Sequence, residues 1–236
     1  MRFEQPLIPG TLIKRYKRFL TDVTLESGEV VCAHCANPGS MLSVNAPGSA
    51  VMLSPATNPE RKLRYSWEMI RVGTSWVGIN TARPNAIVEE AINKGAVEEL
   101  TGYATLRREV KYGKNSRIDI LLEDPARPPC YVEVKNVTMR RDLAEGAPAE
   151  FPDAVTARGA KHLEELSDMV KKGFRAVMFY LVQRQDADGL TVAADIDPTY
   201  AEGLKRARKA GVEVVSYACR VGPDEIVVDR PMALRL

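Results

Sequence analysis

The sequence predicts two domains: an N-terminal all-β, OB-like barrel in residues 1–81 and a C-terminal α/β domain with a mixed sheet in residues 82–236. Two observations support this prediction. Short β-rich segments separated by turn signals fill the first domain, and closing such strands into a barrel removes their exposed edges. Helix-like and strand-like segments alternate in the second domain, a pattern typical of helices packed on a sheet.

In the first domain, turn residues such as Glu26-Ser27-Gly28 and Asn37-Pro38-Gly39-Ser40 separate the strand-like segments. The segments themselves are rich in β-branched and aromatic residues, which favour strands. We expect strands at residues 11–25, 30–35, 50–54, 63–72 and 76–80.

The second domain begins where the pattern changes, after Thr81-Ala82-Arg83-Pro84. From there apolar residues recur at helical spacing, which predicts a helix over residues 84–100, with Pro84 in its first turn and Gly102 just past its end. Further along, we expect strands at 106–112, 117–123 and 130–138, a helix at 153–172, a buried apolar strand at 176–183, and a last helix and strand at 198–210 and 212–217.

The composition is that of a soluble globular protein, with 45% hydrophobic residues, 27% charged residues and a net charge of only +2. No apolar run approaches the roughly 20 residues that cross a bilayer, and the N-terminus lacks the apolar core of a signal peptide. We therefore expect a cytoplasmic protein without a membrane partner. The four cysteines follow neither a disulfide framework nor complete zinc-ligand spacing.

Two segments, residues 117–122 and 130–135, contain the candidate chemistry. The turn-forming residues 124–129 join them, so we expect an antiparallel hairpin. Side chains alternate between the two faces of a strand. The apolar residues of each strand are therefore expected to share one face, Ile118, Ile120 and Leu122 on the first strand and Val132 and Val134 on the second.

This alternation leaves Asp119, Glu133 and Lys135 together on the opposite face. If residue 119 pairs with residue 133, the two carboxylates lie about 5 Å apart, where like charges destabilise a sheet. A hard cation, Mg²⁺ or Mn²⁺, would relieve this repulsion, bound by the carboxylates, the Val134 carbonyl and water. Lys135 would then stabilise charge on a phosphate or hold the attacking water. The alternative is a solvent-facing strand with a simple Glu-Lys ion pair.

A resemblance to a known family covers nearly the whole chain, and many motifs in order carry it. They are residues 15–20 (RYKRFL), 34–41 (HCANPGSM), 109–113 (EVKYG), 116–119 (SRID), 132–138 (VEVKNVT), 151–156 (FPDAVT) and Arg158-Gly159. These resemble the sugar fermentation stimulation protein A family. The resemblance implies an OB-fold domain joined to a PD-(D/E)xK nuclease-like domain. It also implies DNA binding linked to the regulation of sugar, particularly maltose, metabolism.

By that resemblance, Asp119, Glu133 and Lys135 match the acidic pair and the lysine of the nuclease superfamily. One departure is Ile118, which stands where the motif's name has proline. This degeneracy is common in the superfamily and leaves the assignment in place.

Other residues are candidates for supporting roles. The resemblance favours Glu90 over Glu89 as a helix acid that completes the metal site, a choice that helical geometry alone does not make. Gln183, at the end of the buried strand, is a candidate for orienting water or phosphate, or else a strand-end residue that meets solvent. Arg158 and His162 lie four residues apart on one helix face and are candidate phosphate contacts, although a lone helix histidine is more often an ordinary residue.

Positive charge is concentrated in the first domain, where residues 1–81 contain nine Lys/Arg and six Asp/Glu. Cations neutralise phosphates and rings stack on bases, which is how OB barrels hold single strands. We expect Trp67 and Phe19 to lie in the barrel core and the cations to form a DNA-binding face with little sequence preference. The expected DNA-binding residues of this domain are Lys14, Arg15, Lys17, Arg18, Arg61, Lys62 and Arg64.

Three functions remain open at this point. The first is a DNA-binding protein with a Mg²⁺-dependent nuclease site. The second is a non-enzymatic DNA-binding regulator of sugar metabolism that keeps the nuclease fold as a clamp. The third is an adaptor whose barrel binds protein, which predicts binding that is insensitive to salt.

Overall fold

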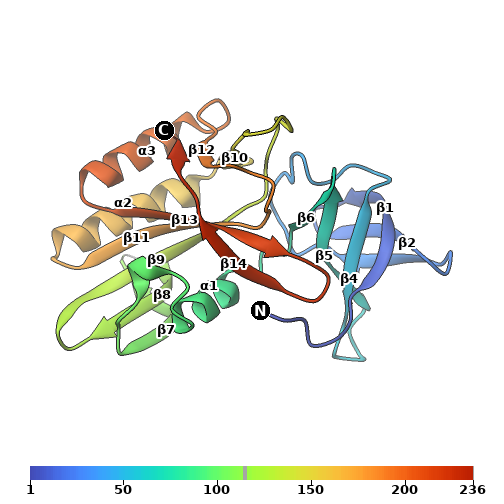
Figure 1. Ribbon diagram of the computed structural model, residues 1–236, viewed down its shortest axis with the longest axis horizontal. Helices are drawn as coiled ribbons and strands as arrows, with labels where there is room; N and C mark the ends of the chain where they lie inside the picture. The colour runs from blue at the N-terminus through green and yellow to red at the C-terminus, as the bar shows by residue number, and fades with distance from the viewer. Residues whose placement is uncertain (114–115, 236) are drawn as a thin grey trace.

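A computed structural model describes residues 1–113 and 116–235 of the chain. Figure 1 shows a strand-rich barrel, coloured blue to teal, beside a larger sheet that has helices on both of its faces. None of the helices in these described ranges is long and apolar enough to span a bilayer.

The N-terminal part is a closed barrel. Its strands run in the order β3-β2-β1-β4-β5-β6, and β3 also pairs with β5, in parallel, at His34 and Ser66, which closes the sheet on itself. Trp67, Leu12 and Leu53 fill the interior, and the exposed fraction of each side chain is at most 1%. The strands are β1 (Ile8–Tyr16), β2 (Leu20–Leu25), β3 (Val30–His34), β4 (Ala50–Pro55), β5 (Tyr65–Val72) and β6 (Ser75–Gly78).

The single strand expected over residues 11–25 is wrong, because the chain turns back between β1 and β2. Lys17 and Arg18 adopt positive φ values of 47° and 64° at this turn. Two successive residues with positive φ make the tight turn that suits a hairpin, but such turns normally contain Gly, Asn or Asp. The sequence therefore contains no turn signal at this point.

The C-terminal part is built on one mixed sheet in the order β14-β13-β11-β9-β8-β7, in which β11 runs parallel to both β9 and β13. A small second sheet has the order β10-β12-β15. The strands are β7 (Thr105–Tyr112), β8 (Ser116–Asp124), β9 (Arg127–Val137), β10 (Ala149–Phe151), β11 (Arg175–Val182), β12 (Leu190–Val192), β13 (Glu213–Val221), β14 (Ile226–Pro231) and β15 (Leu234–Arg235).

The helices give this sheet two cores. Helix α1 (Pro84–Asn93) packs its apolar stripe against one face, while α2 (Ala157–Lys171) and α3 (Pro198–Lys209) cover the other. A short 3₁₀ turn, η1 (Glu98–Leu100), follows α1. Helix α1 ends earlier than predicted because Gly95, at φ 71°, takes the left-handed conformation that terminates helices. The segment from 96 to 100 is therefore not part of the helix.

Several contacts join the two parts, and three of them come from separate segments of the N-terminal part. Residues 1–3 lie along the start of β14, where Met1 and Ile226 exchange hydrogen bonds of 2.8 and 3.0 Å. The Gly78 amide donates to the Gln183 carbonyl at 2.9 Å. The Met41 amide donates to Asp153 Oδ2, also at 2.9 Å. The chain's own N-terminus thus helps to fasten the barrel to the sheet.

Candidate acidic metal site

The predicted hairpin is confirmed as β8 and β9, which pair in antiparallel register at Ile120 with Val132 and at Leu121 with Tyr131. The next positions in that register are Asp119 and Glu133. Regular pairing stops there, and Asp119 Oδ2 instead accepts a hydrogen bond from the Val134 amide at 2.8 Å. The hairpin therefore brings the two acidic residues to neighbouring positions and fixes one oxygen of Asp119.

The expectation that Ile118 shares a face with Ile120 and Leu122 is wrong. Ile120 packs in the core beneath α1, whereas Ile118 packs in the core beneath α2. The alternation breaks at Asp119, opposite an irregularity of β7 at Glu109, which has a φ of 54° and no partner in the register between β7 and β8. This irregularity lies within the candidate site.

Asp119 lies half-buried between β9 and helix α1. Its Oδ1 accepts a hydrogen bond from Asn85 Nδ2, in the first turn of α1, at 2.9 Å. Burial and repulsion from Glu133 raise the pKa of Asp119 above its ordinary value, against the opposite effect of its two donors. A positive charge placed nearby would remove this penalty.

Glu133 is 3% exposed and lies within a cluster of charged and polar groups on the α2 side of the sheet. Its Oε1 accepts from Lys135 Nζ at 2.7 Å and contacts His162 Nδ1. Burial alone would raise the pKa of Glu133, but the hydrogen bond with His162 and the charge of Lys135 outweigh it and hold the pKa below its ordinary value. Glu133 therefore stays ionised in a buried setting.

Three polar groups surround the His162 ring: Arg158 at Nε2, and Glu133 and Lys135 at Nδ1, where Lys135 Nζ lies 3.1 Å away and the Glu133 oxygen is nearer. Arg158 Nε, a donor only, lies 3.3 Å from His162 Nε2, and Glu133 Oε1 contacts Nδ1. These partners suit the tautomer in which Nδ1 holds the proton. His162 and Lys135 then both donate to the same oxygen of Glu133, which leaves Oε2 buried without a hydrogen-bond partner among the described residues.

The donor set suits a hard divalent cation. Magnesium is commonly held by one or two carboxylates with water completing its shell, and Asp119 and Glu133 supply two carboxylates. Glu133 Oε2 is a buried oxygen that lacks a donor, and Asp119 bears an electrostatic penalty that a cation would relieve. Among the described residues, no group of three or more acids, histidines and cysteines is already gathered in metal-binding geometry.

Two predicted site residues lie outside this network. Glu90 pairs with the amino group of Met1 at 2.5 Å and with Lys94, so both of its oxygens are engaged away from Asp119. Gln183 is fully buried and donates to Asn136 at 2.7 Å, and its Oε1 faces Gly78 of the barrel. Both residues contribute to contacts between the N-terminal and C-terminal parts, whereas the hydrogen bonds that Asp119 accepts within the described residues come from Asn85 and Val134.

The predicted cations of the barrel fall into two groups. Arg15 is a structural residue, because its guanidinium donates to the carbonyls of Asn37 and Gly39 at 2.8 and 2.9 Å. Arg61 is half-buried and donates to Ser66 Oγ at 2.9 Å. The others are exposed: Lys14 on β1, Lys17 and Arg18 at the β1–β2 turn, and Lys62 and Arg64 on the loop before β5. Their contact with DNA remains a prediction.

The two aromatic predictions have different outcomes. Trp67 is fully buried, as expected, and donates its indole N–H to the Met69 carbonyl at 2.9 Å. Phe19 is 48% exposed, so its assignment to the core is wrong. It follows the tight turn at Lys17 and Arg18, which points it away from the barrel interior.

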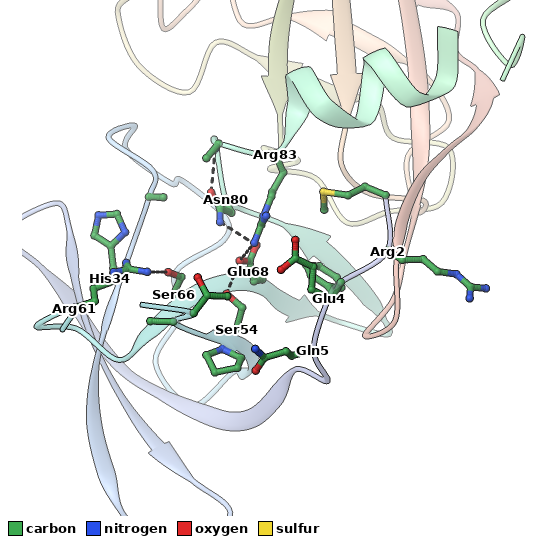
Figure 2. Close-up of a pocket in the computed structure, with 17 residues that line it drawn as sticks. Arg2, Glu4, Gln5, His34, Ser54, Arg61, Ser66, Glu68, Asn80 and Arg83 are labelled. Carbon is green, nitrogen blue, oxygen red and sulfur yellow. Dashed lines mark hydrogen bonds and ion pairs between the residues drawn. The ribbon is translucent and has the colours of Figure 1, made fainter. Parts of the chain in front are cut away.

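A polar cavity of about 530 Å³ lies between the N-terminal segment and the barrel. Figure 2 shows Arg61 and His34 on one wall and the fully buried Glu68 on its floor. Arg83, just before α1, donates to both oxygens of Glu68 at 2.6 and 3.1 Å. Sequence reasoning missed Glu68, because nothing in the strand pattern of 63–72 distinguishes an acid that points inward.

Two family models match the chain. The model described as the SfsA N-terminal OB domain matches residues 13–79, and the model described as the sugar fermentation stimulation protein RE domain matches residues 82–225. The observed closed barrel and the mixed sheet with helices agree with these descriptions. The predicted fold classes of both domains are thereby confirmed.

Relatives align along almost the entire chain. A sugar fermentation stimulation protein homolog of Rhodospirillum rubrum is 61% identical and covers 94% of each chain. A homolog of Rhodospirillum centenum is 58% identical and covers 99% of each. A solved structure described as Pyrococcus furiosus SfsA in complex with Ca²⁺ matches with a TM-score of 0.89 at 26% identity, over 100% of this chain and 98% of that one. The chain therefore belongs to the sugar fermentation stimulation protein family.

Proposed function

We propose that this chain is a DNA-binding protein with a Mg²⁺-dependent phosphodiesterase site of the nuclease type at Asp119, Glu133 and Lys135. The observation that carries the proposal is the pair of neighbouring acids on β8 and β9, half-buried Asp119 and buried Glu133, beside the ammonium of Lys135. Glu133 Oε2 has no donor there, which favours a cation as its partner. The description of the Pyrococcus furiosus relative as a Ca²⁺ complex also supports a site for a hard divalent ion in this family.

Each side chain has a distinct part in this proposal. Asp119 and Glu133 would hold the metal, together with the Val134 carbonyl, and a bound Mg²⁺ would supply an activated water and charge neutralisation at the phosphate. Lys135 lies on the same strand face as Glu133 and would orient a phosphate oxygen or the attacking water. His162 keeps Glu133 ionised and in place. Arg158 is exposed at the edge of this cluster, where it would contact a phosphate.

The barrel would provide affinity rather than chemistry. Its exposed cations would follow the phosphate backbone, which gives binding with little sequence preference and a strong dependence on salt. These cations are Lys14, Lys17, Arg18, Lys62 and Arg64. DNA held in this way would then reach the acids of the second domain. Arg15 contributes less than its neighbours, because its donors are already used within the barrel.

The test is cleavage of supercoiled, linear and single-stranded DNA with Mg²⁺ or Mn²⁺. Cleavage should disappear with EDTA and with Asp119→Asn or Lys135→Ala. Glu123→Gln is the matched control, because Glu123 lies on the same strand and pairs with Arg107 at the sheet surface. The proposal fails if clean wild-type protein cuts no form of DNA, or if the control variant loses activity to the same extent.

A second function is favoured by one observation, the ion pair that already holds Lys135 at 2.7 Å from Glu133. A lysine satisfied in this way suits a non-enzymatic DNA-binding regulator of sugar metabolism that retains the nuclease fold. Retained DNA binding without metal-dependent turnover would support this alternative. Absence of binding to any nucleic acid would remove both.

A further inference from the structure

We infer that Glu109 and Asn85 are additional ligands for the divalent cation, on the side of Asp119 that faces helix α1. This inference rests on the proposed function for the existence of a cation site. The two oxygens of Asp119 have different environments. Oδ2 is fixed by the Val134 amide at 2.8 Å, whereas Oδ1 points toward Asn85. Both oxygens accept a hydrogen bond, but the donor to Oδ1 is a side chain that can turn away, whereas the donor to Oδ2 is a backbone amide of β9. Oδ1 is therefore the oxygen that a metal could take over from its donor.

A second carboxylate lies at the same place. Asn85 Nδ2 lies 2.9 Å from Asp119 Oδ1 and 3.3 Å from Glu109 Oε1, so its two amide hydrogens are directed at two acids. Two negatively charged oxygens within reach of one nitrogen are also within reach of a single cation. The amide nitrogen thus marks a point between two carboxylates.

The amide of Asn85 contains the oxygen that a cation would need. Turning the amide about its last side-chain bond exchanges Nδ2 for Oδ1 at the same position. The donors would then be three oxygens, from Asn85, Glu109 and Asp119, which is the ligand type that Mg²⁺ and Mn²⁺ prefer. Asn85 would act as a donor to the acids without the ion and as an acceptor toward the ion.

The backbone of Glu109 is unusual in a way that fits this role. Its neighbours Arg108 and Val110 pair regularly with β8, but Glu109 adopts a φ of 54°, which is strained for a residue that has a side chain. Such strain persists at functional sites where the surroundings hold it. Here the strained residue lies opposite Asp119, and its carboxylate lies beside Asn85.

The proposal supplies a third acid in place of Glu90, the acid predicted on helix α1. The helix presents Asn85 to Asp119, and Glu90 turns toward Met1 and Lys94. A third acid comes instead from the strand that precedes the hairpin. Glu109 is exposed, so it can release or bind an ion without unfolding the sheet.

The experiment measures Mn²⁺ binding to the full-length protein without DNA, by titration calorimetry and by the paramagnetic signal of free Mn²⁺. Glu109→Gln should weaken Mn²⁺ affinity at least tenfold, and Asn85→Ala severalfold, whereas the surface control Glu123→Gln should leave it unchanged. Glu109→Gly guards against misfolding, because glycine accepts the positive φ. It should keep the melting temperature of the metal-free protein, because relief of the strain offsets the entropic cost of glycine, and still lose Mn²⁺ affinity.

The outcomes separate this inference from the proposed function. If Asp119→Asn abolishes Mn²⁺ binding while Glu109→Gln stays within twofold of wild type, the assignment of Glu109 is overturned and the acidic site stands. If wild-type protein binds no Mn²⁺, both ideas fail. Loss of affinity in Glu109→Gln, in a protein that keeps its melting temperature, supports the assignment.

Discussion

At the scale of single residues, the candidate site depends on how a buried carboxylate is kept charged. Glu133 is nearly inaccessible to water, and a buried charge without partners would be neutralised or would destabilise the fold. Lys135, on β9, and His162, on α2, both donate to one oxygen of Glu133 and so stabilise its charge. Their contribution to stability can be measured separately from any activity.

Replacing His162 by Phe should lower the free energy of unfolding by about 1–3 kcal/mol at pH 7, the usual result of leaving a buried acceptor short of a donor. Urea denaturation measures the change. In the double variant with Glu133→Gln, the same replacement should cost less, because no full charge is left without its donor. Equal losses in the two backgrounds would show that His162 acts through packing alone.

A second carboxyl gives a pH dependence. Asp186 is held by Arg184 and Arg140, which outweigh burial and lower its pKa below the ordinary 3.8. A carboxyl with a lowered pKa stabilises the fold above its unfolded pKa, and this contribution disappears as the pH falls through the folded value. The stability advantage of wild type over Asp186→Asn should therefore be constant near pH 7 and shrink below about pH 4. Urea midpoints between pH 7 and pH 3 test this, and an advantage that stays constant to pH 3 would contradict it.

The acids on the hairpin could be predicted because strands alternate with a period of two, so that Asp119 and Glu133 had to meet if their strands paired. The residues that contact these two acids could not be predicted in this way. His162 comes from a helix 29 residues after Glu133, and only the packing of α2 on the sheet brings the two together. Glu109 reaches the site through a strained backbone, for which the sequence contains no turn residue.

At the scale of elements, helix α1 determines which side chains reach Asp119. Its apolar residues were predicted correctly from their spacing, and they do pack on the sheet. Spacing did not predict which polar side chain of this helix contacts Asp119. That residue is neither Glu89 nor Glu90 but Asn85, about one turn earlier. The chain direction at Arg83, which is fixed by Glu68 of the barrel, positions that first turn.

The end of α1 offers a test of an element by itself. Gly95 has a φ of 71°, and a methyl group added there would meet no atom within 4 Å, so only the backbone conformation resists substitution. Gly95→Ala should therefore destabilise the protein by about 1 kcal/mol. Gly222→Ala is the control, because Gly222 has no positive φ and its nearest neighbour is 3.9 Å away. Equal stability of the two variants in thermal denaturation would contradict this account of the helix end.

At the scale of the whole molecule, the two domains are joined by contacts that could not be predicted from the sequence. The chain's first residues lie on β14, and Asp153, beyond the hairpin, accepts hydrogen bonds from Ser40 and Met41 of the barrel. Sequence periodicity reports which residues face a core within one domain, but it contains no information on how two domains dock. This docking sets the path that DNA would take from the barrel to the acids.

The salt dependence of DNA binding tests that path. Lys62 and Arg64 are exposed on the loop before β5. Replacing both by Ala should weaken binding to single-stranded DNA uniformly across sequences. The slope of log affinity against log salt should become less steep by about 1.4, or about 0.7 for each lost phosphate contact.

The control must remove the same charge from a surface that DNA would not touch. Lys171 and Lys205 lie on α2 and α3, with side chains 69% and 63% exposed, away from the barrel loop. The double variant Lys171→Ala with Lys205→Ala should leave the slope unchanged, since contact with phosphate, and not net charge, determines counterion release. Equal effects of the two double variants would show that DNA does not bind specifically to the cations of the barrel. DNA binding through phosphate contacts releases counterions and must weaken as salt rises. If the affinity of the protein for DNA does not change with salt, the barrel does not bind phosphates, and a protein partner is favoured.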